Sequence, residues 1–273
     1  MVMRSHRHRR RRSPVGVIIL VLFVGYLVWR SNRHSAPPVA TPSVPGMTGR
    51  TTPDINPIAN MLKPRADVER RDGVAIAVLV DVSGSMRRDV PAQGGSRAKI
   101  EIARSSVLDL VRQTAAFTQQ HPERVVELGL YEFSSRRRPP SCRVVLPPGR
   151  PDVDAAARAV RRMVPDGGTP IGDAIIKARR DLDATGLRDQ HILVVTDGEN
   201  TQGYSPADVA QALARLPDED RPALYLVAFD TAAEQFEAVR EAGGLVLGAS
   251  SQSDLQQTLD YVLTGRILAE QPE

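Results

Sequence analysis

Short apolar runs alternate along most of the chain with longer segments of helical spacing. Residues 74–80 are β-branched and apolar throughout, which is typical of a strand buried on both faces of a parallel sheet. Residues 98–118 follow with apolar side chains at helical spacing. Further strands are expected at 125–133, 142–146, 191–196, 223–229 and 244–248, and further helices at 152–163, 171–183, 206–216, 231–242 and 252–267. This order predicts an α/β fold: a mostly parallel sheet with helices on both faces and the short strand 142–146 at an edge.

The amino-terminal part of the chain has the pattern of a membrane anchor. Residues 14–29 form an uncharged, mostly apolar run between Arg12 and Arg30. At ~1.5 Å per helical residue the run is slightly short for a ~30 Å hydrocarbon core, which snorkelling arginines can offset. The positive-inside rule then predicts a basic cytoplasmic tail at 1–13, a single-pass signal anchor at 14–30 in the cell membrane, and an extracytoplasmic domain. A cleaved signal peptide is the alternative, although residues 31–36 offer no clear pair of small residues at the required spacing.

Composition separates this anchor from a folded domain. Residues 35–65 contain seven prolines, which predicts a Pro-rich linker over 31–71 and a domain at 72–268. The net charge of +4 is misleading, because residues 1–34 hold eight arginines and no acid, and the remainder has 28 basic and 32 acidic residues. That balance gives no support to a nucleic-acid-binding domain. The single cysteine, Cys142, excludes an internal disulfide.

Oxygen-bearing side chains stand where two of the predicted strands end. Asp81, Ser83 and Ser85 follow the first strand at a spacing of two, so a turning backbone can bring them to one point. Thr169 lies in a Gly-Gly-Thr-Pro sequence before a helix, and Asp197 ends a later strand. Open α/β sheets place their binding crevices at the carboxyl ends of the strands. Hard divalent cations prefer such oxygen ligands, so the pattern predicts a metal site.

This arrangement resembles the von Willebrand factor type A (vWA) domain and its metal-ion-dependent adhesion site (MIDAS), as found in bacterial, membrane-anchored proteins. The family writes the site as Asp-x-Ser-x-Ser, then a distant Thr, then a distant Asp, and the matching residues here are Asp81, Ser83, Ser85, Thr169 and Asp197. The resemblance covers roughly residues 72–268. It implies a Rossmann-like sheet with Mg²⁺, or Mn²⁺ or Ca²⁺, at its carboxyl-end edge. It also implies that a partner protein completes the coordination with an Asp or Glu carboxylate.

Each of these residues also has a simpler structural interpretation. Asp81 and Ser83 alone could form a turn at the strand end through local bonds to the backbone. Thr169 could cap the following helix, instead of ligating or as well, and the two glycines before it serve backbone geometry. Asp173 and Glu199 are near the motifs in sequence, and we interpret each as a cap or a solvated acid.

Three arginines in the loop after the first strand are expected beside the metal. Arg87, Arg88 and Arg97 could steer an acidic partner toward it. An ordinary solvated loop explains them equally well. The two histidines of the domain, His121 and His191, stand apart from any Cys or His cluster, which argues against a zinc site.

These features predict a binding module and no enzymatic activity. A membrane-tethered domain would capture an acidic protein ligand through the cation. An assembly or regulatory subunit is the first alternative, because many bacterial proteins of this family work with AAA-type ATPases of the MoxR kind. Those ATPases are cytoplasmic, whereas the predicted topology places this domain outside. A metal-dependent hydrolase is the second alternative. An aspartyl-phosphate phosphatase would need an acid where Ser83 stands, however, and no Gly-x-Ser-x-Gly or Gly-x-Gly-x-x-Gly occurs.

Overall fold

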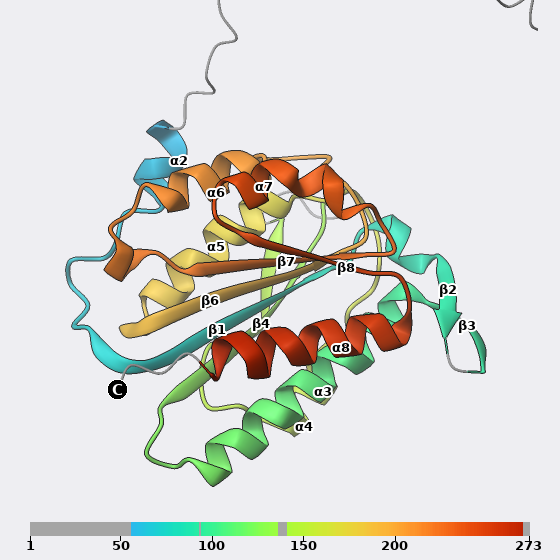
Figure 1. Ribbon diagram of the computed structural model, residues 1–273, viewed down its shortest axis with the longest axis horizontal. Helices are drawn as coiled ribbons and strands as arrows, with labels where there is room; N and C mark the ends of the chain where they lie inside the picture. The colour runs from blue at the N-terminus through green and yellow to red at the C-terminus, as the bar shows by residue number, and fades with distance from the viewer. Residues whose placement is uncertain (1–55, 93, 136–140, 270–273) are drawn as a thin grey trace, which may run out of the picture. The chain divides into compact units, whose positions relative to one another are not determined.

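A six-stranded sheet with the order β5-β4-β1-β6-β7-β8 forms the centre of the computed structural model, which describes residues 56–92, 94–135 and 141–269 (Figure 1). Its strands are β1 Arg71–Asp81, β4 Val126–Phe133, β5 Cys142–Leu146, β6 Leu187–Thr196, β7 Ala223–Phe229 and β8 Leu245–Ala249. β5 pairs antiparallel with β4 at one edge, and all other pairings are parallel. The predicted α/β fold with a mostly parallel sheet, flanked by helices, is therefore confirmed.

Helices cover both faces of the sheet (Figure 1). They are α2 Asn56–Met61, α3 Lys99–Gln120, α4 Val153–Arg161, α5 Ile171–Asp183, α6 Pro206–Ala214, α7 Glu237–Glu241 and α8 Gln252–Val262. Because side chains alternate along a strand, β1 supplies both cores. Its residues Ile76 and Val78 pack in the core with α3, α4 and α8, whereas Ala77 and Leu79 pack in the core with α2, α5 and α6. This double burial explains why the strand is apolar without interruption.

Three predicted segments differ from the structure. The loop expected after the first strand contains a 3-10 turn, η1 Gly84–Arg87, and an antiparallel hairpin of β2 Asp89–Ala92 and β3 Gly95–Ala98. Such a short hairpin, in which Val90 is buried, gives little periodic signal. The helix expected at 231–242 is divided into the 3-10 turn η3 Ala233–Phe236 and α7, and the last helix continues after α8 as a π turn, η4 Leu263–Ile267.

The predicted linker 31–71 is wrong for its last part. Residues 56–61 form α2, and Ile58 and Leu62 are buried in the core beside α5 and α6. Prolines lower local helical propensity, but burial of two large aliphatic side chains outweighs that preference. The tail at 1–13, the anchor at 14–30 and the linker up to residue 55 lie outside the described residues. Among the residues that are described, no helix is long and apolar enough to cross a membrane.

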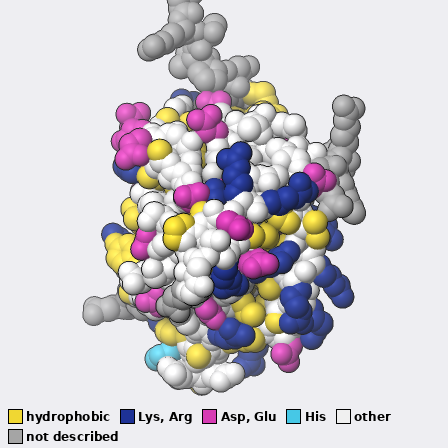
Figure 2. All heavy atoms as spheres, turned by 90° about the vertical axis from the view of Figure 1, so that its right-hand side faces the viewer, with side chains coloured by type: hydrophobic (Ala, Val, Ile, Leu, Met, Phe, Trp, Pro, Cys, Tyr) yellow, Lys and Arg dark blue, Asp and Glu magenta, His cyan; other side chains and the backbone are white. Residues whose placement is uncertain are grey.

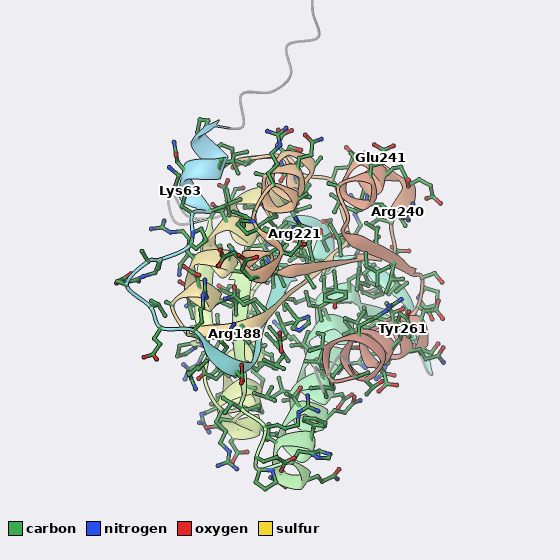
Figure 3. The ribbon with its side chains drawn as sticks, turned by 60° about the vertical axis from the view of Figure 1, so that its left-hand side comes forward. Lys63, Arg188, Arg221, Arg240, Glu241 and Tyr261 are labelled. Atoms are coloured by element: carbon green, nitrogen blue, oxygen red, sulfur yellow. The ribbon has the colours of Figure 1, made fainter. Side chains whose placement is uncertain are left out.

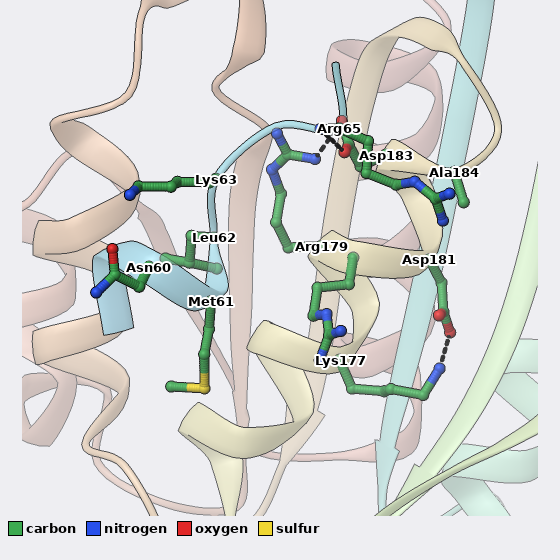
Figure 4. Close-up of a pocket in the computed structure, with 11 residues that line it drawn as sticks. Asn60, Met61, Leu62, Lys63, Arg65, Lys177, Arg179, Asp181, Asp183 and Ala184 are labelled. Atoms are coloured by element: carbon green, nitrogen blue, oxygen red, sulfur yellow. Dashed lines mark hydrogen bonds and ion pairs between the residues drawn. The ribbon is translucent and has the colours of Figure 1, made fainter. Parts of the chain in front are cut away.

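Buried ion pairs fasten this amino-terminal segment to α5. Asp183 lies at the end of α5, where it accepts hydrogen bonds from the Arg65 backbone N–H at 2.6 Å and from the Arg70 guanidinium at 2.6 Å. The buried Arg179 guanidinium lies 3.1 Å from the same carboxylate. Figure 4 shows the Arg179 guanidinium facing the Asp183 carboxylate at the pocket between α2 and α5. Burial alone would raise the pKa of Asp183, but these donors outweigh it and lower the pKa below its usual value.

Removing this carboxylate should destabilise the domain strongly. We expect Asp183→Ala to lower the free energy of unfolding by about 3–5 kcal/mol, because the Arg179 charge would stay buried with only the neutral oxygens of Gln190 and the Asp220 backbone as partners. Asp109→Ala is the matched control, since the Asp109–Arg112 pair is exposed and should contribute no more than about 1 kcal/mol. Urea unfolding of the full chain measures both changes, and equal losses would contradict the importance of burial here.

A buried histidine should make stability depend on pH. His191 is 4% exposed in the middle of β6, its Nδ1 atom is 3.3 Å from the Tyr225 hydroxyl, and burial lowers its pKa to about 4. Between pH 6.5 and 4 the unfolded chain binds a proton that the folded domain does not. The contribution of neutral His191 to the free energy of unfolding is therefore fully present above this window. It is lost as the pH falls through the window, by roughly 3 kcal/mol at most.

The variant His191→Gln should remove this part of the pH dependence. Urea unfolding at pH 7 and at pH 4.5 should show a smaller loss of stability on acidification in the variant than in the wild type. The difference between the two proteins cancels the contribution of other titrating groups. An unchanged loss would assign the acid sensitivity to carboxylates instead.

Candidate metal centre

The first candidate ligand is a buried carboxylate at the end of the central strand. Asp81 is the last residue of β1 and is fully buried. Its Oδ1 accepts a hydrogen bond from the Ser83 backbone N–H at 2.7 Å, and its Oδ2 accepts one from the Thr196 hydroxyl at 2.6 Å. Burial raises the pKa of Asp81 to about 6, although the bonds from Thr196 and Ser83 oppose this shift. A cation beside this carboxylate would offset its desolvation.

The two serines stand next to each other at the start of η1. Their Oγ atoms are 3.0 Å apart, and the Ser85 hydroxyl donates to Asp197 Oδ1 at 2.7 Å. Adjacent ligands of an octahedral Mg²⁺ at about 2.1 Å from the ion lie about 3.0 Å from each other. Ser83 and Ser85 therefore have the separation that two neighbouring ligands need. The local turn between Asp81 and Ser83 is also present, so the structural interpretation and the ligand interpretation are compatible.

A glycine-rich loop brings Thr169 toward this turn. The Gly84 backbone N–H donates to the Gly167 carbonyl at 2.9 Å, and Gly167 has φ 77°, a conformation that favours glycine. A Cβ atom on Gly168 would lie 2.6 Å from the Thr201 hydroxyl. Thr169 itself is buried, and its backbone N–H and carbonyl both bond to Thr201. The interpretation of the two glycines as backbone devices is thus confirmed.

Thr169 is not the cap of α5. The structure assigns Pro170 to the cap position, with no capping bond from a side chain. The Ile171 backbone N–H instead donates to Asn200 Oδ1 at 2.8 Å. Asp173 accepts hydrogen bonds from the Tyr204 backbone and the Ser141 hydroxyl in the first turn of α5, so it fixes a loop.

Two charged residues at this end of the sheet were missed by the sequence reasoning. Lys99, the first residue of α3, is 3% exposed, and its Nζ lies 3.0 Å from Asp197 Oδ2 and 2.8 Å from Asp230 Oδ2. Asp230 directly follows β7. The sequence holds an indication of each residue's position. Lys99 stands four residues before Ala103, on the apolar face of its helix, and Asp230 follows an apolar strand as Asp81 does.

Two of the arginines near the site contact other residues of the chain. The Arg87 guanidinium donates to the Pro165 carbonyl and lies 3.7 Å from an Asp166 carboxylate oxygen, and Arg97 lies 3.7 Å from Glu101. Figure 2 shows lysine and arginine side chains among acidic ones on this end of the molecule. Basic side chains also occur at the opposite end, where Figure 3 shows Lys63, Arg188 and Arg221.

The chemistry of the site depends on hydroxyl donors as well as carboxylates. Across residues 56–92, 94–135 and 141–269, no group of three or more His, Cys, Asp or Glu side chains is placed to hold a metal ion. Ser83 and Ser85 supply neutral oxygens, and Asp81 and Asp197 supply charge close to them. This donor set matches a hard divalent cation that keeps part of its positive charge and some of its waters.

Comparisons with known proteins agree with the α/β fold. Residues 76–199 match the family model described as the von Willebrand factor type A domain. The SpRpn10 VWA domain has 17% identity and a TM-score of 0.50, over 70% of this chain and 95% of that one. The vWF domain of the type V pili tip protein Mfa5 from Porphyromonas gingivalis has 11% identity and a TM-score of 0.53, over 74% of this chain and 98% of that one.

A third similar structure is the PilB minor pilin from Streptococcus sanguinis. It has 13% identity and a TM-score of 0.53, and the match covers 74% of this chain and 62% of the pilin. No curated protein matches the chain. At these identities the similar structures establish only the fold. The match to the family model shows that the sequence of residues 76–199 also follows the pattern of the family. Residues 76–199 therefore match a von Willebrand factor type A domain in sequence, and the described domain has the fold of such domains.

Proposed function

We propose that this domain captures a protein partner through a divalent cation held at a MIDAS. Asp81, Ser83, Ser85, Thr169 and Asp197 form the site, and Mg²⁺, or Mn²⁺ or Ca²⁺, is the cation. The observation that carries the proposal is the pair of serine Oγ atoms, 3.0 Å apart, with Ser85 bonded to Asp197. Two neutral hydroxyls at ligand spacing beside a buried carboxylate suit a cation far better than they suit an apolar core.

The partner would complete the coordination with an Asp or Glu carboxylate. Because Ser83 and Ser85 are neutral, a bound cation keeps enough charge to attract one more anionic oxygen. Asp197 would act through the Ser85 hydroxyl, which it orients, as outer-shell groups do in metal sites. Arg88 is exposed on the same loop and would attract an acidic partner at long range. No catalytic step is assigned to the site.

The proposal includes a membrane tether. Residues 14–30 would anchor the chain with a cytoplasmic tail at 1–13, and the domain would then lie on the extracytoplasmic side. The names of several structurally similar proteins, a minor pilin, a pili tip protein and a pilus adhesin, are consistent with a protein-binding domain. We propose the same class of role for this chain.

Metal binding should depend on the serine pair. In calorimetric titration of the full chain, we expect Ser85→Ala to bind Mg²⁺ at least about tenfold more weakly than the wild type, because one donor and the orientation of Asp197 are lost together. Ser105→Ala is the control, since its hydroxyl bonds to the Ile102 carbonyl within α3. Equal affinity of the Ser85 variant and the wild type would rule out this site.

Partner capture should follow the metal. Affinity capture with the full chain in Mg²⁺ should retain a protein that is released by chelator and not retained by Ser85→Ala. Replacing acidic residues of that protein by their amides should abolish the interaction. A partner retained equally in chelator and in Mg²⁺ would contradict cation-mediated binding while leaving the fold assignment intact.

A further inference from the structure

Lys99 is an unusual component of a cation site, because it places a positive charge inside it. Lysine is rarely buried unless it is paired. Here the side chain is 4% exposed, and its ammonium group bridges Asp197 and Asp230 at 3.0 and 2.8 Å. The bridge joins the start of α3 to the ends of β6 and β7.

The second partner of Lys99 is held in a constrained conformation. Within the described part of the chain, Asp230 is the only non-glycine residue with positive φ, at 51°. Its backbone N–H donates to the Ala249 carbonyl at 2.7 Å, which links β7 to the end of β8. Such backbone conformations persist where surrounding contacts fix them. The ion pair with Lys99 is one such contact, so the position of Asp230 is determined from both sides.

Lys99 also determines how Asp197 faces the site. One oxygen of Asp197 accepts from Ser85 at 2.7 Å and the other accepts from Lys99 at 3.0 Å. With both oxygens engaged, the carboxylate is oriented to hold the Ser85 proton. Ser83 then donates to Ser85 across the 3.0 Å contact, and one lone pair of the Ser85 hydroxyl remains available for a cation.

The charges of this cluster suggest the reason for the lysine. Asp81, Asp197 and Asp230 carry three negative charges when ionised, and Lys99 carries one positive charge, which leaves two. A divalent cation would balance them. Without Lys99, three carboxylates would attract the cation more strongly and leave it less able to accept an anionic ligand.

We propose that Lys99 is a positioning residue and internal counter-cation of the metal centre. It holds Asp197 toward Ser85 and weakens the attraction of the site for the cation, so that the bound cation keeps its affinity for a partner carboxylate. This inference rests on the proposed function, since it concerns the same metal site.

Two variants with opposite expected effects test the inference by Mg²⁺ titration of the full chain. Lys99→Met removes the positive charge but keeps the Ser85 bond that holds Asp197, so it should bind Mg²⁺ at least about tenfold more tightly, although its metal-free form should unfold at a lower temperature. Asp230→Asn removes a negative charge at a side chain that is 42% exposed, and it should bind Mg²⁺ more weakly. Lys177→Met is the control, because its partner Asp181 belongs to α5, and it should leave the Mg²⁺ affinity unchanged.

The outcomes separate the two proposals. A purely structural role for Lys99 would lower the unfolding temperature in Lys99→Met without tightening Mg²⁺ binding, and this result would overturn the inference. If Lys99→Met does not fold, the Mg²⁺ affinity of Asp230→Asn tests the inference. An affinity of this variant equal to or tighter than that of the wild type would overturn the inference. Loss of Mg²⁺ binding in Ser85→Ala would still support the metal site in either case. A wild-type chain that binds no divalent cation would overturn both.

Discussion

The parallel register of three neighbouring strands imposes the main electrostatic constraint on this domain. Val80 of β1 pairs with Val195 of β6, and Thr196 pairs with Ala228 of β7, so these strands end near the same level. An aspartate stands at the end of each strand or directly after it, at 81, 197 and 230. Asp81 and Asp197 are shielded from water, so their like charges need compensation. The hydroxyl of Thr196, the backbone N–H of Ser83 and the ammonium group of Lys99 provide it.

The backbone around these carboxylates is fixed by a loop that requires glycine at two positions. Gly167 bonds to Gly84 in a conformation that favours glycine, and Gly168 lies against Thr201 and Ser135. The loop that carries Thr169 is thereby joined both to the turn after β1 and to the loop after β6. Preorganised ligands need this kind of support, because a flexible loop would pay the ordering entropy when the cation binds.

At the opposite end of the sheet, arginines neutralise the buried carboxylate. Asp183 accepts hydrogen bonds from the Arg65 backbone N–H and the Arg70 guanidinium, and it forms an ion pair with Arg179. The contacts fasten the segment before β1 to α5 and extend the folded domain to residue 56. One end of the sheet therefore pairs its buried carboxylate within the chain, whereas the other combines oxygen donors with a partly compensated negative charge.

The sequence by itself determined the α/β order, the buried central strand and the five candidate ligands, because apolar periodicity and residues at strand ends are local properties. It did not predict the hairpin of β2 and β3, the packing of α2 or the ion pair of Lys99 with Asp197 and Asp230. Ile58 could be assigned to the core only once α5 and α6 offered it an apolar surface. Likewise, Lys99 and Asp230 are separated by 130 residues along the chain, and only the packing of α3 against the sheet makes them partners. Tertiary structure decided these features because burial and charge pairing depend on which distant residues share a space.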